Sequence, residues 1–256
     1  MAKIPDPEVV DPAALAAAYL AGETDLIVVL GPTASGKTRY AVSLARALSR
    51  QTSRPAEILS ADSRQVYRGM DIGTGKDLAE YGDVPYHLID LVPAGSRYNV
   101  YQYQAAFAEA YASVRSRGAI PILCGGTGMW IESVTRSYKF QKENGVAAEK
   151  LPQRPFYIGT IVTREERVAR IDKRLDERLE EGLVEEIRGL LESVAPEDLI
   201  YYGLEYKFVT QYVLGELSYE DMVVALGNAI HQFAKRQMTW FRGMERDGIR
   251  IHWVRP

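Results

Sequence analysis

The sequence has little cysteine and no long hydrophobic run, and both absences limit what the protein can be. Cys124 is the only cysteine among 256 residues, which excludes an internal disulfide framework and a cysteine-based zinc site. No apolar run approaches the roughly 20 residues that span a bilayer, and the N-terminus, MAKIPDPEVV, lacks the long apolar core of a secretory signal. We therefore expect a cytoplasmic protein with no membrane partner.

A strong excess of either charge is also absent. The 31 basic and 34 acidic side chains leave a formal net charge of -3. This balance argues against a large nucleic-acid-binding surface without sequence preference, although it leaves room for a local basic patch. The composition, 46% hydrophobic and 25% charged, is typical of an ordinary globular protein.

What the sequence does contain is a phosphate-binding motif, G-x-x-x-x-G-K-[ST], which reads GPTASGKT. An apolar run at 26–30 precedes it and a helical pattern at 39–50 follows it, which is the strand–loop–helix context that the motif requires. The glycines allow the backbone to wrap closely around an anion, and a helix N-terminus attracts negative charge. We expect Lys37 to reach terminal phosphate oxygens and the Thr38 hydroxyl to bind Mg²⁺. The predicted diphosphate-binding residues are Gly31, Pro32, Thr33, Ala34, Ser35, Gly36, Lys37 and Thr38.

Short apolar runs alternate with helical periods along the chain. This alternation predicts an α/β fold, with a P-loop NTPase-like parallel sheet flanked by helices and a helical C-terminal part. Strands are expected at 26–30, 57–60, 85–90, 119–124, 156–162 and 249–254, and helices at 13–21, 39–50, 99–117, 164–181, 183–192, 204–214 and 218–245. We expect residues 1–24 to form an N-terminal arm, mobile over 1–10, with a short helix, and 25–256 to form one domain.

Asp62 follows the second expected strand, and in a doubly wound sheet ligands bind beyond the carboxyl ends of the strands. We expect its carboxylate to lie in the same crevice as the phosphate loop, as a Mg²⁺ ligand or a general base. The expected strand 119–124 opens into a glycine cluster at 125–128 (GGTG), where backbone can approach a ligand closely. That strand carries no aspartate, which disfavours a motor ATPase or GTPase.

Other charged features have less specific interpretations. The Arg/Glu pairs of the 164–181 helix favour a solvated face over a binding surface. The last helix carries a basic stripe of Lys235, Arg242 and Arg246, with Arg236 adjacent and Trp240 and Phe241 flanking it. This stripe could contact an RNA backbone or equally be solvated. His87 is interpreted as a hydrogen-bonded structural histidine.

Five segments together resemble the tRNA dimethylallyltransferases, also called isopentenyltransferases. The segments read GPTASGKT, SADSRQVYRGMDIGTGK, PYHLID, PILCGGTGMWI and AKRQMTWFR, and the resemblance covers residues 25–254 apart from one segment. It implies transfer of a dimethylallyl group from dimethylallyl diphosphate to N6 of an adenine, with Mg²⁺ as cofactor. In the tRNA enzymes the acceptor is adenosine 37, next to the anticodon.

The resemblance also implies roles for individual residues. Lys37 and Mg²⁺ would stabilise charge on the leaving diphosphate, and Asp62 would accept a proton from the adenine amine. Thr127 would line the reaction channel into which the target base is extruded. The residues implied to contact the tRNA or its adenine are Asp62, Ser63, Arg64, Gln65, Lys235 and Arg236.

The sequence departs from the family pattern at two places. Only the segment 137–155 stands where the family has a helical subdomain that grips the anticodon stem-loop. The segment 199–203 reads LIYYG and lacks the arginine that the family commonly places nearby to contact diphosphate. Arg64, Arg68 or Lys207 could take over that contact.

Three other functions are compatible with the sequence. An isopentenyltransferase acting on free AMP, ADP or ATP agrees with the short 137–155 segment. A small-molecule or nucleoside kinase would use ATP in the same loop, and a non-catalytic nucleotide-binding module would not need the absent arginine. The expected partners are therefore dimethylallyl diphosphate and tRNA, or a free adenine nucleotide, and we expect the chain to act as a monomer.

Overall fold

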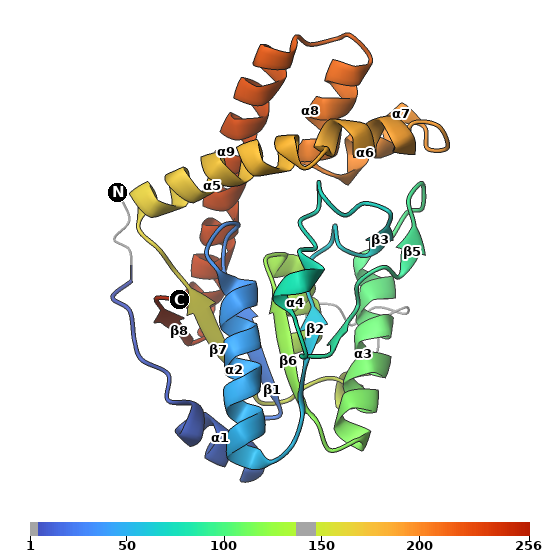
Figure 1. Cartoon of the computed structure of the whole chain (residues 1–256). Helices are drawn as coiled ribbons and strands as arrows, with labels where there is room; N and C mark the ends of the chain where they lie inside the picture. Colours follow the sequence, from blue (N-terminus) through green and yellow to red (C-terminus); the bar gives the residue numbers. More distant parts are fainter. Residues whose placement is uncertain (1–4, 137–146) are drawn as a thin grey trace.

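A six-stranded parallel sheet forms the centre of the computed structural model, which describes residues 5–136 and 147–256 (Figure 1). Its strand order is β4-β2-β6-β1-β7-β8, and the strands are β1 (Leu26–Leu30), β2 (Ala56–Ser60), β4 (Tyr86–His87), β6 (Ile120–Gly125), β7 (Pro155–Thr160) and β8 (Ile251–Val254). Because every ladder is parallel, the carboxyl ends of all strands meet at one edge. The predicted α/β fold with a parallel sheet is confirmed.

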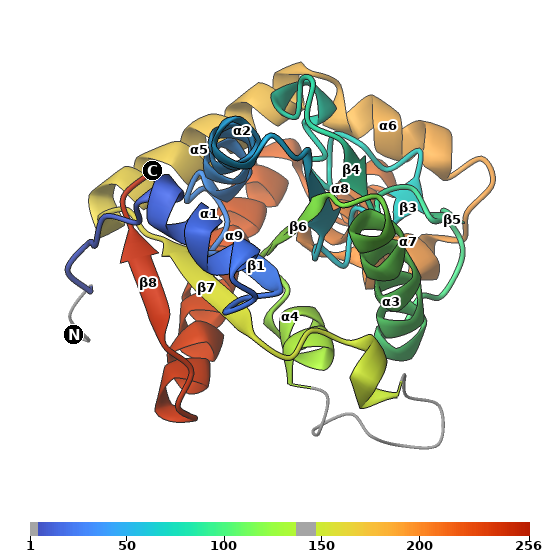
Figure 2. The same ribbon diagram turned by 90° about the horizontal axis from the view of Figure 1, so that it is seen from below.

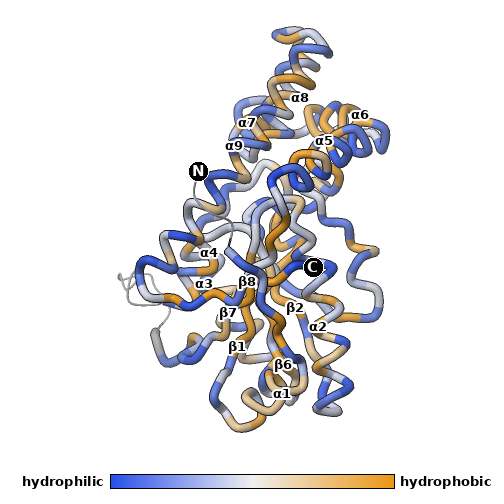
Figure 3. The backbone as a smooth tube through the Cα atoms, turned by 90° about the vertical axis from the view of Figure 1, so that its left-hand side faces the viewer, coloured by the Kyte–Doolittle hydropathy of each residue, from blue (hydrophilic) through white to orange (hydrophobic). Residues whose placement is uncertain are grey.

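Helices cover both faces of this sheet, as the view from below shows (Figure 2). Leu26, Val28 and Leu30 pack into one core with α3 (Val100–Ser116), α4 (Gly128–Thr135) and α9 (Tyr219–Arg246). Ile27 and Val29 point the other way, into a second core with α1 (Pro12–Leu20) and α2 (Lys37–Thr52). Side chains alternate along a strand, so a strand buried on both faces reads as the unbroken apolar run of β1. Figure 3 shows this hydrophobic stretch inside the molecule.

A helical part lies beyond the carboxyl edge of the sheet (Figure 1). It comprises α5 (Arg164–Glu180), α6 (Leu183–Leu190), α7 (Pro196–Tyr202), α8 (Leu204–Val213) and the first half of α9. A capping box begins α5, since Glu166 N donates to Thr163 Oγ1 (3.1 Å) and Thr163 N donates to Glu166 Oε2 (2.9 Å). The second half of α9 returns to the sheet, where Phe241 and Met244 join its core. This one helix therefore connects the helical part to the sheet.

Several elements differ from the sequence expectation. The strand predicted at 85–90 is reduced to β4, because Leu88 and Asp90 have φ angles of 66° and 58°, which interrupt extended backbone. The sequence also gave no sign of α4, α7, the short parallel pair β3 (Tyr67–Arg68) and β5 (Val92–Pro93), or the 3₁₀ turns η1 (Leu78–Glu80) and η3 (Ala148–Lys150). Strands and 3₁₀ turns of two or three residues are too short to display a hydrophobic period.

Glu8, in the segment expected to be a mobile arm, contacts the edge of the sheet. Glu8 N donates to Trp253 O (2.6 Å), and the Glu8 carboxylate bonds to the ring of His252 (2.8 Å). The exposed edge of β8 supplies these partners. Residues 137–146 of the expected short segment lie outside the described residues. Within the described residues, none of the helices combines the length and apolar character needed to cross a lipid bilayer.

Candidate active site

The phosphate loop is anchored on the neighbouring strand β7. Ser35 Oγ and Thr160 Oγ1 are hydrogen bonded at 2.7 Å, and both residues are buried. A Cβ at Gly31 would lie 2.3 Å from Thr160 Oγ1, so only glycine allows this approach. Gly36 has a φ of 81°, a left-handed conformation that favours glycine, and α2 begins at Lys37. The loop therefore has a fixed base with its amide groups at a helix N-terminus.

A cavity of about 430 Å³ opens above this loop, at the carboxyl edge of the sheet. Many of the residues singled out from the sequence line it, namely Thr33, Ala34, Lys37, Thr38, Asp62, Ser63, Arg64, Gln65, Thr127 and Arg236. The remaining loop residues, Gly31, Pro32, Ser35 and Gly36, do not line it, and neither does the exposed Lys235. The sequence motifs thus converge on one cavity, although the first residue, Thr33, and the last, Arg236, are 203 positions apart in the sequence.

Lys37 and Asp62 form the charged centre of this cavity. Burial lowers the pKa of Lys37 from its ordinary value, and the nearby Asp62 carboxylate opposes that shift. Asp62 Oδ1 also accepts a hydrogen bond from Arg64 N (3.0 Å), which orients the carboxylate. The lysine therefore gains charge stabilisation from a carboxylate, and an incoming anion would add to it.

The GGTG cluster is joined directly to the segment that carries Asp62. Thr127 Oγ1 accepts a hydrogen bond from Ser63 N (3.0 Å), and Thr127 N donates to Ala61 O (3.2 Å). A Cβ at Gly125 would lie 2.2 Å from Ala61 O, so glycine is required for the two segments to approach. Thr127 thereby fixes the backbone next to Asp62 as well as lining the cavity.

Gln237, which the sequence analysis missed, connects three parts of the site. This buried α9 side chain accepts a hydrogen bond from Thr33 N at Oε1 (2.8 Å) and donates from Nε2 to Gly126 O (3.0 Å). It links the phosphate loop and the GGTG cluster to the last helix. The signal that could have found it is its position in AKRQMTWFR, one helical turn from two other cavity residues, Phe233 and Trp240.

Aromatic side chains of α9 form the rim of the cavity. Trp240 is 43% exposed, yet its indole is held in place because Nε1 donates to Glu132 Oε2 (2.8 Å). A Cβ at Gly128 would lie 2.2 Å from the Trp240 ring. The guanidinium of Arg236 lies 5.8 Å from the centre of the Phe233 ring. Arg236 and Trp240 also line a second, open hollow of about 400 Å³.

The interpretation of the 164–181 helix as a solvated face is wrong for two arginines. Arg174 and Arg178 line the cavity together with Ile171 and Leu175. Both arginines form ion pairs with Asp77, and Arg178 also donates to the carbonyl of Ile72. Their spacing from the buried Ile171 and Leu175 places them on the inward face of α5, which is the signal that the sequence offered.

Of the three cations suggested for the missing arginine, Arg64 is the one that lines the cavity. It lies against Gly203, where a Cβ would be 3.2 Å from its Nε. Arg68 donates to Asp90 O (3.4 Å), and Lys207 lies over the Phe208 ring (5.3 Å). The cavity also contains Glu205, whose pKa is raised by burial against the opposing effect of nearby arginines.

The interpretation of His87 as a hydrogen-bonded histidine is confirmed. His87 Nε2 is hydrogen bonded to Glu57 Oε2 at 2.6 Å. Cys124 is buried, and burial raises the pKa of its thiol to about 12, so it stays protonated at neutral pH. In the part of the chain that the structure describes, no cluster of three or more His, Cys, Asp or Glu could hold a metal.

Comparison with known proteins gives a consistent result. A family model described as IPP transferase matches residues 65–153 and 139–244. The tRNA dimethylallyltransferase 1 of Parabacteroides distasonis is 46% identical, over 90% of this chain and 92% of the relative. The tRNA dimethylallyltransferase 2 of Porphyromonas gingivalis is 47% identical, over 90% of this chain and 93% of that relative.

A solved structure agrees with these relatives. The tRNA isopentenylpyrophosphate transferase of Bacillus halodurans matches with a TM-score of 0.75 and 26% identity, over 90% of this chain and 89% of that one. The parallel sheet, the phosphate loop and the sequence matches point in the same direction. This chain belongs to the IPP transferase family, whose matched relatives are tRNA dimethylallyltransferases.

Proposed function

We propose that the protein transfers a dimethylallyl group from dimethylallyl diphosphate to N6 of adenosine 37 in tRNA and releases diphosphate. One observation carries the proposal: the Asp62 carboxylate and the phosphate-loop residues Lys37 and Thr38 open into the same cavity. A diphosphate bound by the loop leaves the rest of the cavity, including Asp62, for the allylic group and the acceptor amine.

The phosphate loop supports the donor half of the reaction. Amide groups at the start of α2 and the Lys37 ammonium would bind the diphosphate and stabilise its charge as the allylic C–O bond breaks. The Thr38 hydroxyl lines the cavity without a hydrogen-bond partner among the described residues, so it is free to hold Mg²⁺ beside the diphosphate oxygens. When bound, Mg²⁺ supplies further positive charge to the leaving group.

Asp62 supports the acceptor half. The adenine N6 attacks the allylic carbon, so that an N–C bond forms while the C–O bond breaks, and the proton lost by N6 passes to the Asp62 carboxylate. The hydrogen bond from Arg64 N and the adjoining Ser63–Thr127 contact keep this carboxylate in place. Release of diphosphate and the alkylated adenine completes the reaction.

The rim supports RNA as the acceptor. Phe233 and Trp240 expose aromatic surface beside Arg236, and the bases of single-stranded RNA stack on aromatic side chains and arginines. Trp240 also borders the second hollow, where nucleotides that flank the target adenine have room to bind.

A free adenine nucleotide is the second candidate acceptor, for one reason. The alignment with the Parabacteroides relative runs over 288 positions but includes 90% of this chain of 256 residues, so the relative has several dozen residues without a counterpart here. The two family-model matches overlap over 139–153, inside the 137–155 segment where we expect the tRNA-gripping subdomain to be missing. A chain without that subdomain has less surface for a folded tRNA.

A product assay separates these functions. Purified protein is incubated with dimethylallyl diphosphate and Mg²⁺, in parallel with unmodified tRNA, AMP or ATP, and the adenines are examined by mass spectrometry. We expect a dimethylallyl group on tRNA. Product on AMP or ATP alone would make the free nucleotide the acceptor, and no alkylated adenine in any tube would reject both. In a separate tube that contains ATP and a nucleoside, formation of ADP would indicate a kinase.

We also infer that the protein acts as a cytoplasmic monomer, where tRNA is available to it. Groups for both halves of the reaction come from one chain, so the site needs no second copy. Light scattering should therefore give a mass near 28.6 kDa.

A further inference from the structure

One wall of the cavity is formed by backbone of the segment 70–77, called here the 70–77 loop. Gly73, Thr74 and Gly75 of this loop line the cavity. The loop also contacts the substrate-binding stretch, since Gln65 Nε2 donates to Gly75 O (3.1 Å). Its position therefore affects the shape of the cavity and the residues next to Asp62.

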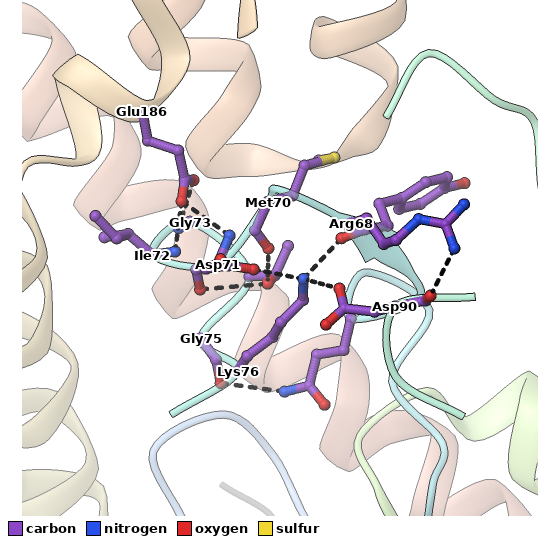
Figure 4. A network of polar contacts seen from close by, with 12 residues as sticks. Arg68, Met70, Asp71, Ile72, Gly73, Gly75, Lys76, Asp90 and Glu186 are labelled. Atoms are coloured by element: carbon purple, nitrogen blue, oxygen red, sulfur yellow. Dashed lines mark hydrogen bonds and ion pairs between the residues drawn. The ribbon is translucent and has the colours of Figure 1, made fainter. Parts of the chain in front are cut away.

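A carboxylate from the helical part binds this loop. Glu186 of α6 accepts hydrogen bonds from three successive amides, Asp71 N (2.8 Å), Ile72 N (2.7 Å) and Gly73 N (3.1 Å), as Figure 4 shows. A fourth comes from the hydroxyl of the buried Tyr206 (2.7 Å). Successive amides that point at one site form an anion-binding nest, and here a side chain of the protein occupies it.

The sheet side of the loop has a separate anchor. The buried ammonium of Lys76 lies between the carboxylates of Asp71 (2.6 Å) and Asp90, and it donates to Tyr67 O (2.7 Å) (Figure 4). Lys76 thus secures the end of the loop. From α5, Arg174 and Arg178 hold Asp77, and Arg178 also holds the carbonyl of Ile72. The amides of Asp71, Ile72 and Gly73 are bound by Glu186.

From these contacts we propose that Glu186 is a positioning residue for the acceptor side of the reaction, an inference that rests on the proposed function. Its anion fixes the 70–77 loop against α6 and α8, and the loop in turn supports Gln65 through Gly75 O. Gln65 Oε1 accepts from Ser60 Oγ (3.0 Å), two residues before Asp62. Glu186 touches no reacting atom and acts through this chain of contacts.

The phosphate loop does not depend on Glu186, because its contacts run to Thr160 and Gln237 instead. This separation makes the proposal testable. In the Glu186→Gln variant an NH₂ group replaces one carboxylate oxygen, and the negative charge is lost. We expect kcat/KM for the acceptor to fall by about 10- to 100-fold, as small misplacements at an active site do, while the Kd for inorganic diphosphate changes less than about twofold.

Glu185→Gln is the matched control. Glu185 is the neighbouring residue on α6, its side chain is 69% exposed, and its ion-pair partner is Arg188 (3.8 Å). We expect this variant to keep both acceptor kcat/KM and diphosphate affinity. Tyr206→Phe removes one of the four hydrogen bonds while keeping the ring, so its loss in acceptor kcat/KM should be smaller than that of Glu186→Gln.

Hydrogen exchange tests the geometry without any assay of activity. The amides of Asp71, Ile72 and Gly73 should lose protection in Glu186→Gln and keep it in Glu185→Gln. Unchanged protection, or unchanged acceptor kcat/KM, in Glu186→Gln would overturn the proposal, and so would a parallel loss of diphosphate affinity. A wild-type protein that alkylates no acceptor would reject the proposed function, and the exchange result would still decide whether Glu186 holds the loop.

Discussion

At the scale of single residues, the site depends on a carboxylate and an ammonium that face one cavity. Asp62 sits at the end of a parallel strand, where the fold exposes it to ligands, and Lys37 begins the helix that follows the phosphate loop. Until an anion binds, the Asp62 carboxylate partly offsets the cost of burying the positive charge of Lys37. This arrangement gives the two residues different functions that substitution can separate.

The first prediction concerns Asp62→Asn. The amide cannot accept the proton from N6, so turnover should fall by about 10²- to 10⁴-fold, which is the usual contribution of a general base. The diphosphate Kd should change little, because the phosphate loop is untouched. Single-turnover mass spectrometry with tRNA and calorimetry with diphosphate measure the two effects. Asp83→Asn, at an exposed carboxylate paired with Arg46, serves as the control. Normal turnover in Asp62→Asn would exclude Asp62 as the general base.

The second prediction concerns the pH dependence of diphosphate binding. Burial lowers the pKa of Lys37 below its ordinary value of 10.5, and the protonated form binds the anion. Affinity should therefore decline as the pH rises through the lowered pKa of Lys37, in a window that begins below 10.5. An arginine stays charged at these pH values. The Lys37→Arg variant should therefore bind diphosphate more weakly, with an affinity that changes less with pH. Titration calorimetry from neutral to alkaline pH gives both curves, and equal slopes would contradict the assignment.

At the scale of elements, α9 does two tasks, since it packs on the sheet and also contributes polar side chains to the site. Gln237 is the clearest case because its amide joins Thr33 and Gly126. A helix that completes a site in this way couples stability to ligand binding.

Gln237→Ala should show that coupling. Loss of two hydrogen bonds at a buried position should lower the free energy of unfolding by about 1–2 kcal/mol and weaken diphosphate binding. Gln211→Ala, on the exposed face of α8 with a 3.3 Å contact to Glu216, should change neither. Chemical denaturation and calorimetry supply the two measurements. Normal diphosphate affinity in Gln237→Ala would mean that the bridge does not shape the loop.

Sequence patterns predicted the elements better than the side chains that complete the site. Buried parallel strands appear as apolar runs, and Asp62 could be found because it follows one of them. Glu186 could not, since its neighbour Glu185 is the same residue type and the two differ only in the face of α6 that they occupy. The inward Arg178 and the bridging Gln237 were missed for the same reason: a polar residue on a helix does not reveal its partner.

At the scale of the whole molecule, a net charge of -3 means that RNA binding depends on local cations. Arg236 on the cavity rim and the exposed Lys235 are the candidates on α9. If they contact phosphates, the KM for tRNA should rise with salt, because bound counterions are released when RNA binds.

Substitution tests this dependence. Arg236→Ala and Lys235→Ala should each reduce the slope of log KM against log salt by about one, whereas Arg50→Ala, on α2 of the opposite layer, should leave it unchanged. The KM for AMP, if that nucleotide is an acceptor, should vary much less with salt. Slopes that match the wild type in both α9 variants would exclude these residues from RNA binding.

The parallel sheet has a further consequence for synthesis of the chain. Parallel pairing requires long connections, and the Thr33–Gln237 bond spans 204 residues. The phosphate loop therefore leaves the ribosome long before the helix that braces it, and β8, at the sheet edge, emerges later still. A nascent chain that lacks α9 contains the phosphate loop without the Gln237 hydrogen bond to Thr33. Non-local contacts of this kind form slowly. Competence to bind diphosphate should consequently appear only after α9 has been synthesised.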